Sequence, residues 1–420
     1  MANVSSSNGL EKYPKLRFKG FSEPWEHIKL SDFVSRVTRK NSDNQTDIPL
    51  TISSKDGLIN QNEFFSKQVA SKDMSGYYLL QRGEFAYNKS YSVGFDFGSI
   101  KRLEKYEQGA LSTLYICFTL NRFDSDFIKH YFDSLKWYRE IYMISAEGAR
   151  NHGLLNVPTE DFFATLHSLP MDAAEQRKIA EFLDILTTRI EKQQALVDNL
   201  KKYKRGVITS ILKQKIRFNS GVEKYPEWST IRLDELGFFF GGLSGKTKDD
   251  FEHGDGKFIT YLNVFRNTFA LEKGVTLVDV KPNEKQNVIQ YGDILFTQSS
   301  ETVEEVGMSS VWLHQSTPYL NSFCMALRPY SLEYINPKYI GYVLRSEQVR
   351  LQIMKEGQGI SRINLASSRI GGVTLPMPCL EEQNSIVKFV DGIEATEAFH
   401  SQLLLQMQSL KSSLLQKLFI

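Results

Sequence analysis

The sequence predicts an α+β protein made of two similar α/β domains separated by two long helices that pair as an antiparallel coiled coil. Three observations support this fold class: the chain is long, its segments recur in order, and each copy ends in a heptad-patterned stretch. With 420 residues, 41% of them apolar, the chain is too long for a single domain core of ordinary size and can form at least two. We therefore expect an internal duplication with pseudo-twofold symmetry.

The duplication is visible as short matches that keep their order along the chain. Each match is weak alone, and chance similarity is the alternative, but an offset that varies only slightly is typical of two copies with loop insertions. The matched segments are residues 25–32 with 228–235 (offset 203), 83–87 with 292–296 (offset 209), Cys117 with Cys324 (offset 207), and 169–171 with 375–377 (offset 206).

Each copy ends in apolar residues spaced alternately by three and four, which is the core pattern of a coiled coil. Pro170, followed by Asp172 and Glu175 as a capping box, predicts where the first helix begins. The core positions of the first helix are Ile179, Leu183, Leu186, Ile190, Gln193, Val197, Leu200, Lys204, Val207 and Ile211. Those of the second helix are Ile386, Val390, Ile393, Glu397, His400, Leu404, Met407, Lys411, Leu414 and Leu418.

The charges of the two helical segments favour pairing with each other. Residues 172–217 hold eleven Lys and Arg against six Asp and Glu, whereas residues 379–420 hold three against five. The chain ends with the second helix, so an antiparallel pair would place one domain near each end of the coiled coil. The alternative is that each helix packs only on its own domain.

The predicted domain boundaries follow from the repeats and the helices. They are an N-terminal tail (1–24), a first domain (25–171), a central spacer helix (172–217), a second domain with its lead-in (218–378) and a C-terminal spacer helix (379–420). The start lacks a signal-peptide pattern, and no apolar run approaches membrane-spanning length. Three widely spaced cysteines fit a reducing compartment, so we expect a cytoplasmic protein without membrane association.

Sequence patterns of catalysis are missing. The glycine-rich run 241–247, which contains Lys246, resembles a phosphate-binding loop, but its glycine spacing is one residue too short. A loop that approaches the DNA backbone is the preferred interpretation, and a nucleotide-dependent enzyme is a remote alternative. The seven histidines are scattered without metal-ligand spacing. We expect a non-catalytic chain without its own cofactor or metal.

The doubled architecture resembles the specificity subunit of type I restriction-modification systems. The residues that carry the resemblance are the openings at Trp25 and Trp228, the strand 292–297, the Leu-Pro-Met exits, and the Glu-Gln pairs at Glu175, Gln176, Glu382 and Gln383. The first copy departs from the pattern, with Gly-Glu-Phe-Ala-Tyr where the second has Gly-Asp-Ile-Leu-Phe.

The resemblance implies a function and a set of partners. The two domains would be target-recognition domains, each binding one half of a bipartite, asymmetric site in double-stranded DNA. The helices would set the distance between half-sites and dock two methyltransferase subunits. Restriction subunits with translocase and nuclease activity would join them. S-adenosylmethionine, ATP and magnesium would belong to those partners. A coiled-coil scaffold or adaptor without DNA specificity is the alternative function.

Polar loops at matching places in the two copies are the candidate DNA contacts, because amides and guanidiniums recognise base edges while lysines and hydroxyls contact phosphates. In the first copy the candidates are Asn88, Lys89, Ser90, Tyr91, Arg150, Asn151 and His152. In the second copy they are Lys246, Gln298, Ser299, Ser300, Ser361, Arg362 and Asn364.

Overall fold

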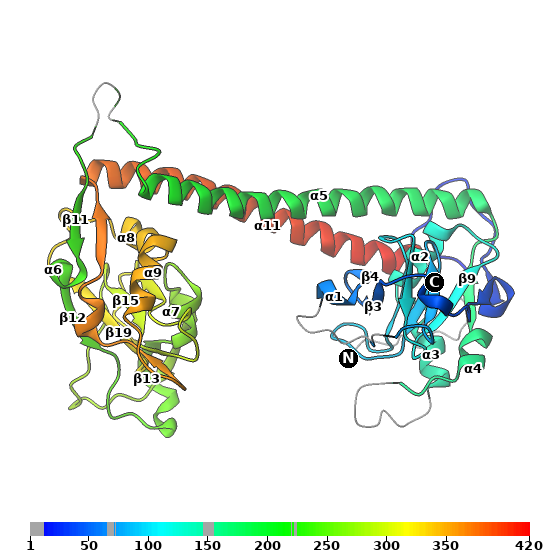
Figure 1. The fold of residues 1–420 in the computed structure, drawn as a ribbon, viewed down its shortest axis with the longest axis horizontal. Coiled ribbons are helices and arrows are strands. Elements are labelled where there is room, and N and C mark those ends of the chain that lie inside the picture. The colour runs from blue at the N-terminus through cyan, green and yellow to red at the C-terminus, as the bar shows by residue number, and fades with distance from the viewer. Residues whose placement is uncertain (1–11, 65–70, 72, 146–154, 220, 222–224) are drawn as a thin grey trace. The chain divides into compact units, whose positions relative to one another are not determined.

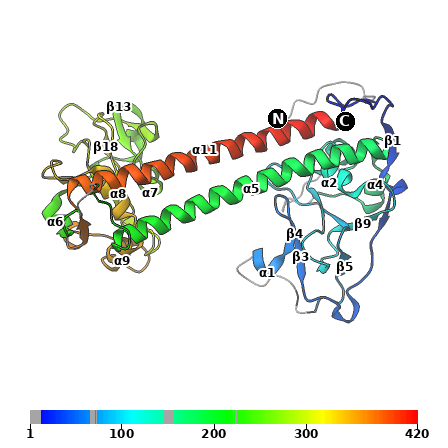
Figure 2. The same cartoon turned by 90° about the horizontal axis from the view of Figure 1, so that it is seen from above.

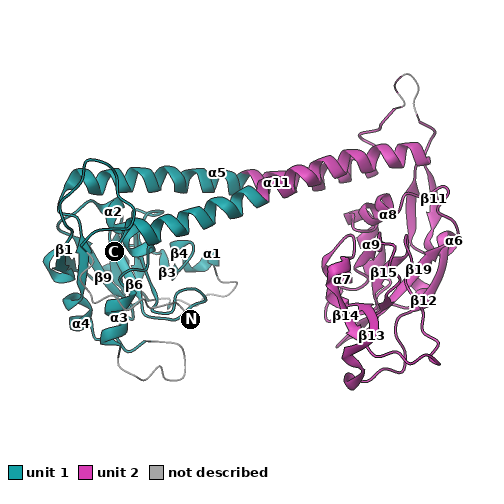
Figure 3. Cartoon of the chain, turned by 180° about the vertical axis from the view of Figure 1, so that it is seen from behind, with its two compact units in different colours: residues 1–195, 402–420 teal, residues 196–401 magenta. Residues whose placement is uncertain are grey.

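The computed structural model describes residues 12–64, 71, 73–145, 155–219, 221 and 225–420. The chain divides into two compact units: unit 1 contains residues 1–195 and 402–420, and unit 2 contains residues 196–401 (Figure 3). Two long helices, α5 (Ala173–Leu212) and α11 (Leu380–Leu418), each contribute one part to each unit. The α+β fold class with two long helices is confirmed.

Unit 1 combines strands with short helices before α5 begins (Figure 1). Its strands are β1 (Glu26–Lys29), β2 (Val34–Arg36), β3 (Pro49–Ser53), β4 (Gly57–Asn60), β5 (Tyr78–Gln81), β6 (Phe85–Asn88), β7 (Ser99–Arg102), β8 (Gln108–Leu111), β9 (Ile116–Leu120) and β10 (Leu166–Leu169). Its helices are α1 (Gln61–Phe64), α2 (Ser125–Asp133), α3 (Tyr138–Ile144) and α4 (Thr159–Ala164), with 3-10 turns at Leu30–Asp32 and Ser42–Asn44.

Unit 2 repeats this pattern between α5 and α11. Its strands are β11 (Ser229–Arg232), β12 (Gly237–Gly241), β13 (Phe251–Ile259), β14 (Val275–Val278), β15 (Ile294–Thr297), β16 (Ser299–Ser300), β17 (Ser309–Val311), β18 (Tyr319–Leu320), β19 (Cys324–Pro329), β20 (Ile363–Asn364) and β21 (Thr374–Met377). Its helices are α6 (Leu233–Leu236), α7 (Tyr261–Arg266), α8 (Pro337–Leu344), α9 (Glu347–Lys355) and α10 (Ser367–Ile370), with 3-10 turns at Lys248–Asp250 and Glu272–Gly274.

Each unit contains its own four-stranded antiparallel central sheet, and the order of corresponding strands is the same in both. In unit 1 the order is β2-β9-β6-β7, and in unit 2 it is β12-β19-β15-β17. A separate two-stranded ribbon joins the first strand of each unit to the last, β1 with β10 and β11 with β21. The second strand layers differ, because β3, β4, β5 and β8 form one sheet in unit 1 whereas β13, β14 and β18 form another in unit 2.

The observed strand pairing shows that two of the matches between the copies, Cys117 with Cys324 and Leu169 with Leu375, are each misaligned by two residues. Cys117 lies opposite Ala86, and the residue opposite the matching Leu295 is Ala326, not Cys324. Likewise Leu169 pairs with Glu26 in unit 1, while Met377 pairs with the matching Ser229. A shift of two keeps each side chain on the same face of its strand, so the apolar pattern alone could not reveal the error.

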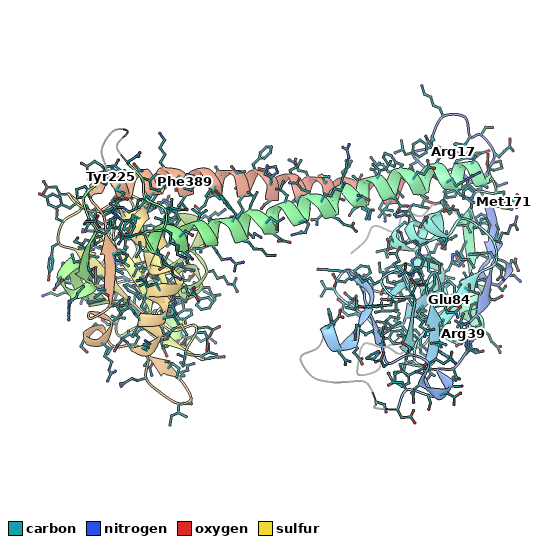
Figure 4. All side chains as sticks on the ribbon, turned by 45° about the horizontal axis from the view of Figure 1, so that its top comes forward. Arg17, Arg39, Glu84, Met171, Tyr225 and Phe389 are labelled. Atoms are coloured by element: carbon teal, nitrogen blue, oxygen red, sulfur yellow. The ribbon has the colours of Figure 1, made fainter. Side chains whose placement is uncertain are left out.

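The Gly-Glu and Gly-Asp pairs that open β6 and β15 have the same role. Glu84 accepts a hydrogen bond from the backbone N–H of Gln81 at 2.8 Å and forms a salt bridge with Arg39 (Figure 4). Asp293 accepts from the N–H of Gln290 at 2.8 Å and is paired with Arg328. Both carboxylates are buried, so the acid is retained as a paired turn residue while the strand after it diverges.

The coiled-coil core positions predicted from the spacing are all buried or half-buried along α5 and α11. In unit 1, Ile179 and Leu183 of α5 share a hydrophobic core with Leu415 and Leu418 near the end of α11. In unit 2, Val207 and Ile211 near the end of α5 share a core with Ile386 and Val390 near the start of α11. The helices therefore run antiparallel, and their ends also pack on the domain cores. Because parts of both helices enter each core, the alternative that each helix packs only on its own domain is wrong.

Polar core positions make the helix pair asymmetric. In unit 2, Lys204 of α5 forms salt bridges with Glu394 at 3.3 Å and Glu397 at 2.8 Å of α11. Lys411 of α11 is the matching residue in unit 1, and it has no salt bridge to another described residue. Burial lowers the pKa of Lys411, with Asp133 and Glu191 nearby acting in the opposite direction.

A buried glutamate near the start of a long helix binds the domain in each unit: Glu175 of α5 in unit 1 and Glu382 of α11 in unit 2. We call the contacts around each of these carboxylates the domain–helix junction. In unit 1 both oxygens of Glu175 accept hydrogen bonds from Arg17, at 2.7 and 2.8 Å. In unit 2 Glu382 accepts from Arg217 at 3.1 and 3.0 Å and from the indole N–H of Trp228 at 2.8 Å. The predicted capping box is thus half right: Asp172 accepts from the N–H of Ala174, but the carboxylate of Glu175 binds Arg17.

The glutamine after each buried glutamate completes the junction. Gln176 donates to the carbonyl of Pro170 and accepts from the N–H of Asp124, which caps α2. Gln383 donates to the carbonyl of Pro378 and accepts from the N–H of Asn336, which caps α8. The Glu-Gln pair therefore holds the lead-in segment, the exit strand and the first helix after the central sheet against one long helix.

A second contact ties α2 and α8 to the long helices. Asp184 of α5 binds Nε2 of His130 at 2.8 Å, and Asp391 of α11 accepts from the hydroxyl of Tyr342 at 2.8 Å. Figure 2 shows α8 beside α11. Part of the predicted tail, residues 12–24, also packs on unit 1. The backbone N–H of Leu16 donates to the carbonyl of Lys417, and the side chain of Arg17 binds Glu175. In each unit the contacts to the long helix therefore extend over more than one helical turn, from Glu175 to Asp184 in α5 and from Glu382 to Asp391 in α11.

Candidate nucleic-acid interface

The two candidate loops of unit 2 meet at the edge of the central sheet. Directly after β15, strand β16 pairs antiparallel with β20, which places Ser299 opposite Asn364 and Ser300 opposite Ile363. The N–H of Leu365 donates to the carbonyl of Gln298 at 2.9 Å, which extends the pairing. Residues far apart in the sequence therefore form one surface, defined here as the β16–β20 edge.

Three side chains of the β16–β20 edge are available to a ligand. Arg362 and Asn364 are exposed and Gln298 is half-exposed. The side chains of these three residues make no hydrogen bond or salt bridge to another described residue, although the backbones of Gln298 and Asn364 are paired. Amide and guanidinium groups each offer two hydrogen-bonding atoms in one plane, the geometry that matches base edges in the major groove. Ser361 is exposed on the same segment.

Glycines shape the segment that presents these residues. Gly359 has a φ of +138°, and a Cβ atom there would lie 1.8 Å from the carbonyl oxygen of Arg362, so only glycine fits. The turn leaves Ile360 fully exposed at its tip. A projecting tip with free polar side chains at its base is suited to entering a groove of a duplex.

Other candidates have internal roles. The hydroxyl of Ser300 donates to the carbonyl of Thr302 and is buried, so this side chain shapes the loop. The ammonium of Lys246 pairs with Glu284 at 2.6 Å, and its side chain is almost fully covered. The same salt bridge raises the pKa of Lys246. Lys246 is therefore already neutralised, and its assignment as a phosphate contact does not agree with this geometry.

The glycine-rich run around Lys246 is built for packing. The backbone at Gly242 passes so close to the carbonyl of Asn321 that a Cβ atom would lie 2.2 Å from it. Gln286 bonds to both the N–H and the carbonyl of Ser244. The run leads into a 3-10 turn of three residues, whereas a phosphate-binding loop leads into a helix whose N-terminus faces the phosphate.

A cavity of about 340 Å³ adjoins the β16–β20 edge. Its walls include the rings of Tyr261 and Phe265, which stack at 6.1 Å, and the exposed ring of Phe323, with Glu301 and Arg362 at its rim. The hydroxyl of Tyr261 donates to the carbonyl of Ser299 at 2.8 Å and so supports β16.

Two half-buried arginines that sequence reasoning missed position this edge. Arg350 of α9 donates to the carbonyls of Glu304, Val306 and Gly307, in the loop after β16. Arg345 donates to the carbonyls of Val264, Phe265 and Asn267 at the end of α7. Burial lowers the pKa of each to about 10, so both stay charged at neutral pH. Arginine in a helical pattern normally indicates a solvated face, so no sequence signal identified them.

The matching edge of unit 1 shows the same backbone contact. The N–H of Leu155 donates to the carbonyl of Lys89 at 3.0 Å, as Leu365 does to Gln298 in unit 2. Asn88 ends β6 and accepts from the N–H of Ser90, and Tyr91 is exposed beside them. The candidates Arg150, Asn151 and His152 lie outside the described residues.

Comparison with known proteins assigns the family. Residues 225–408 match the family model described as the type I restriction modification DNA specificity domain. Residues 225–408 of this chain therefore belong to the type I restriction modification DNA specificity domain family. The match covers the second copy of the duplication and α11 as far as residue 408.

Solved structures share the fold of this chain along nearly its whole length. One, from work on complex assembly and conformational transition of the type I R-M system, is 19% identical with a TM-score of 0.60, covering 94% of this chain and 97% of that chain. The type I system S subunit from M. genitalium is 14% identical with a TM-score of 0.52, covering 97% and 99%. At these identities the likeness concerns the fold alone.

Within the described ranges, no group of three or more His, Cys, Asp or Glu side chains is arranged to hold a metal ion. No helix in the described part of the chain is long and apolar enough to cross a membrane.

Proposed function

We propose that this chain acts as a specificity subunit that recognises a bipartite, asymmetric DNA sequence, with unit 1 binding one half-site and unit 2 the other. The observation that carries the proposal is the matched edge at the end of β6 and β15, where the same backbone contact presents different side chains in the two units. Equal frameworks with unequal contact residues suit unequal half-sites.

The junctions support a fixed spacing between the half-sites. Buried glutamates, paired glutamines and the Asp184 and Asp391 contacts hold each domain to the long helices. Two recognition surfaces on such a spacer would contact DNA about one turn apart, with the base pairs between them unread. The chain would supply geometry and specificity without catalysis.

Partners would supply the chemistry. Two methyltransferase subunits would bind S-adenosylmethionine, and restriction subunits would use ATP and magnesium for translocation and cleavage, all in the cytoplasm. Because the chain has a net charge of only +2, its phosphate contacts are few, and tight DNA binding would depend on the assembled complex.

The test is methylome sequencing of a host that expresses the chain with its methyltransferase, compared with the same host lacking the chain. We expect a split adenine-methylated motif that appears only with the chain. If the complex forms and no new motif appears, the proposal is wrong.

A single substitution refines this test. Replacing Arg362 with alanine removes the unpaired guanidinium of the β16–β20 edge, so we expect one base position in one half-site to become degenerate, which corresponds to a loss of about 1–3 kcal/mol of discrimination. Lys355→Ala, at an exposed lysine of α9, is the matched control and should leave the motif unchanged.

A further inference from the structure

The cavity beside the β16–β20 edge is lined by opposite charges that do not pair with each other. Glu301, Glu305 and Arg362 all line it, yet their side chains make no salt bridge or hydrogen bond to another described residue. Glu301 and Arg362 are exposed, and Glu305 is half-buried. The space between these groups suits a ligand that offers hydrogen-bond donors to the carboxylates and acceptors to the guanidinium.

Tyr261 forms part of the cavity wall and lies within electrostatic range of both kinds of charge. Burial raises the pKa of Tyr261, and among the smaller effects Glu305 raises it further while Arg362 lowers it. Its hydroxyl donates to the carbonyl of Ser299, and its ring stacks on that of Phe265 at an interplanar angle of 15°. Because α7 also packs beside β15 (Figure 1), the two rings form a wall with a fixed position.

An exposed aromatic ring completes the cavity. Phe323 is 55% exposed, although its backbone is fixed: its carbonyl accepts from the N–H of Gln298 at 2.8 Å, and its N–H donates to the side chain of Asn321 at 2.9 Å. An exposed ring on a fixed backbone is suited to stacking on a nucleobase, since every base has a flat π surface. The cavity volume of about 340 Å³ is at the lower end of the range of small-molecule sites, which suits one base.

An apolar residue projects from the same edge. Gln358 and Asn364 exchange backbone hydrogen bonds at 2.9 and 2.7 Å, so residues 358–364 form a closed hairpin. Ile360 at its tip is fully exposed and lies two residues from Arg362 of the cavity. Apolar side chains presented in this way can enter a duplex between bases and occupy the space of a displaced base.

The polar groups of the cavity favour guanine among the four bases. Guanine has N–H donors at N1 and N2 on its pairing edge, which suit carboxylates, and acceptors at O6 and N7, which suit a guanidinium. Adenine and cytosine offer the carboxylates only one amino group, and thymine only one N–H. In a duplex the N1 and N2 donors of guanine are paired with cytosine, so carboxylates reach them only after the base has left the stack.

We propose that the cavity beside the β16–β20 edge is a pocket for one guanine that is turned out of the duplex in the half-site of unit 2, while Ile360 fills the space it leaves. Phe323 stacks on the base, Arg362 binds O6 and N7, and Glu301 and Glu305 accept from N1 and N2. The inference rests on the proposed DNA recognition and adds the way in which unit 2 reads one base.

Chemical modification of the orphaned partner base tests the pocket. The chain is assembled with the methyltransferase of its own system on duplex DNA that carries its methylated motif. Chloroacetaldehyde is then added, because it modifies cytosines whose pairing edge is free. We expect one reactive cytosine in the half of the motif that unit 2 reads, and none in the free duplex. That half is the one that stays unchanged when residues 25–171 are exchanged.

Variants of the pocket and matched controls separate base extrusion from folding. Phe323→Ala, Glu305→Gln and Ile360→Ala should each lower the reactivity of that cytosine by up to about tenfold, because each removes a contact that favours the extruded base. Tyr330→Ala and Glu333→Gln remove a similarly exposed ring and carboxylate outside the cavity and should leave the reactivity unchanged. An unchanged melting temperature of each variant shows that the chain still folds.

A motif that is methylated normally without a reactive cytosine in this half overturns the inference and leaves the proposed function intact. Reactivity confined to adenines, or a reactive cytosine that the pocket variants leave unchanged, overturns it as well. A complex that forms but yields no split motif would contradict the proposed function itself, and this inference with it.

Discussion

The Glu-Gln pairs near the starts of the long helices bind residues that are distant in the sequence through buried side chains. Glu382 is fully buried and accepts hydrogen bonds from both Arg217 and the indole of Trp228. Gln383 donates to the carbonyl of Pro378 and accepts from the N–H of Asn336, the N-cap of α8. Sequence alone placed these residues at a helix start and named them among the carriers of the family resemblance. It could not show that their side chains point into the domain, because the partner arginines lie far away along the chain.

Removing one junction carboxylate should destabilise one unit. Glu382→Ala leaves Arg217 and the indole of Trp228 without their acceptor, so we expect unit 2 to lose about 3 kcal/mol of unfolding free energy. Glu381→Ala, at the exposed neighbour, should change it by less than about 0.5 kcal/mol. Urea unfolding of the two variants provides the comparison, and equal losses would mean that the junction contributes nothing specific.

A buried histidine gives unit 1 a pH dependence. The hydroxyl of Thr165 donates to the carbonyl of Phe162, so it accepts from Nε2 of His167, and Nδ1 then accepts from Tyr131. Burial lowers the pKa of His167 to about 3, below its unfolded value of about 6.5. The folded state therefore resists protonation that the unfolded chain accepts, and its stability is full above pH about 6.5 and falls as the pH drops toward 3.

His167→Gln tests this dependence, because an amide can bridge the same two hydroxyls without titrating. We expect a flatter loss of stability between pH 6.5 and 4 in the variant, measured by urea midpoints. His130, whose pKa burial also lowers, remains in both proteins and contributes the same residual slope. Identical pH profiles would show that His167 does not titrate as its surroundings require.

At the scale of elements, the long helices were the most predictable part of the fold. Their three-four spacing extends over ten positions in each helix, and every one of those positions is covered. The matches between short strands were less reliable, since a shift of two residues preserves the alternation of faces and the coincidences at Cys324 and Pro376 suggested the wrong register. Tertiary contacts alone resolve such shifts.

The two matching lysines of the helix pair should respond oppositely to the same substitution. Lys204→Leu removes the cation that pairs with Glu394 and Glu397, leaving Glu394 with only the hydroxyl of Tyr342, and should cost about 1 kcal/mol after solvent screening. Lys411→Leu replaces a half-buried cation without a salt bridge and should stabilise unit 1 by about 1 kcal/mol. Thermal unfolding of the two variants measures both signs, and shifts in the same direction would refute the asymmetry.

At the scale of the whole molecule, duplication accounts for both the repeated framework and the divergent edges. The sequence predicted two domains and two helices from ordered repeats, together with the loops after β6 and β15. It could not predict which loop residues remain free, because Ser300 and Lys246 differ from Arg362 only in the tertiary partners they find. Nor could it reveal that each unit is completed by parts of both long helices.

The most direct test of two independent recognition domains on one spacer is a domain exchange read by methylome sequencing. Residues 25–171 are replaced by the corresponding segment of a specificity subunit with a different known target, with the methyltransferase unchanged. We predict that one half of the methylated motif changes to that of the donor, while the other half and the number of unread base pairs stay the same. A change in both halves, or in neither, would contradict the account.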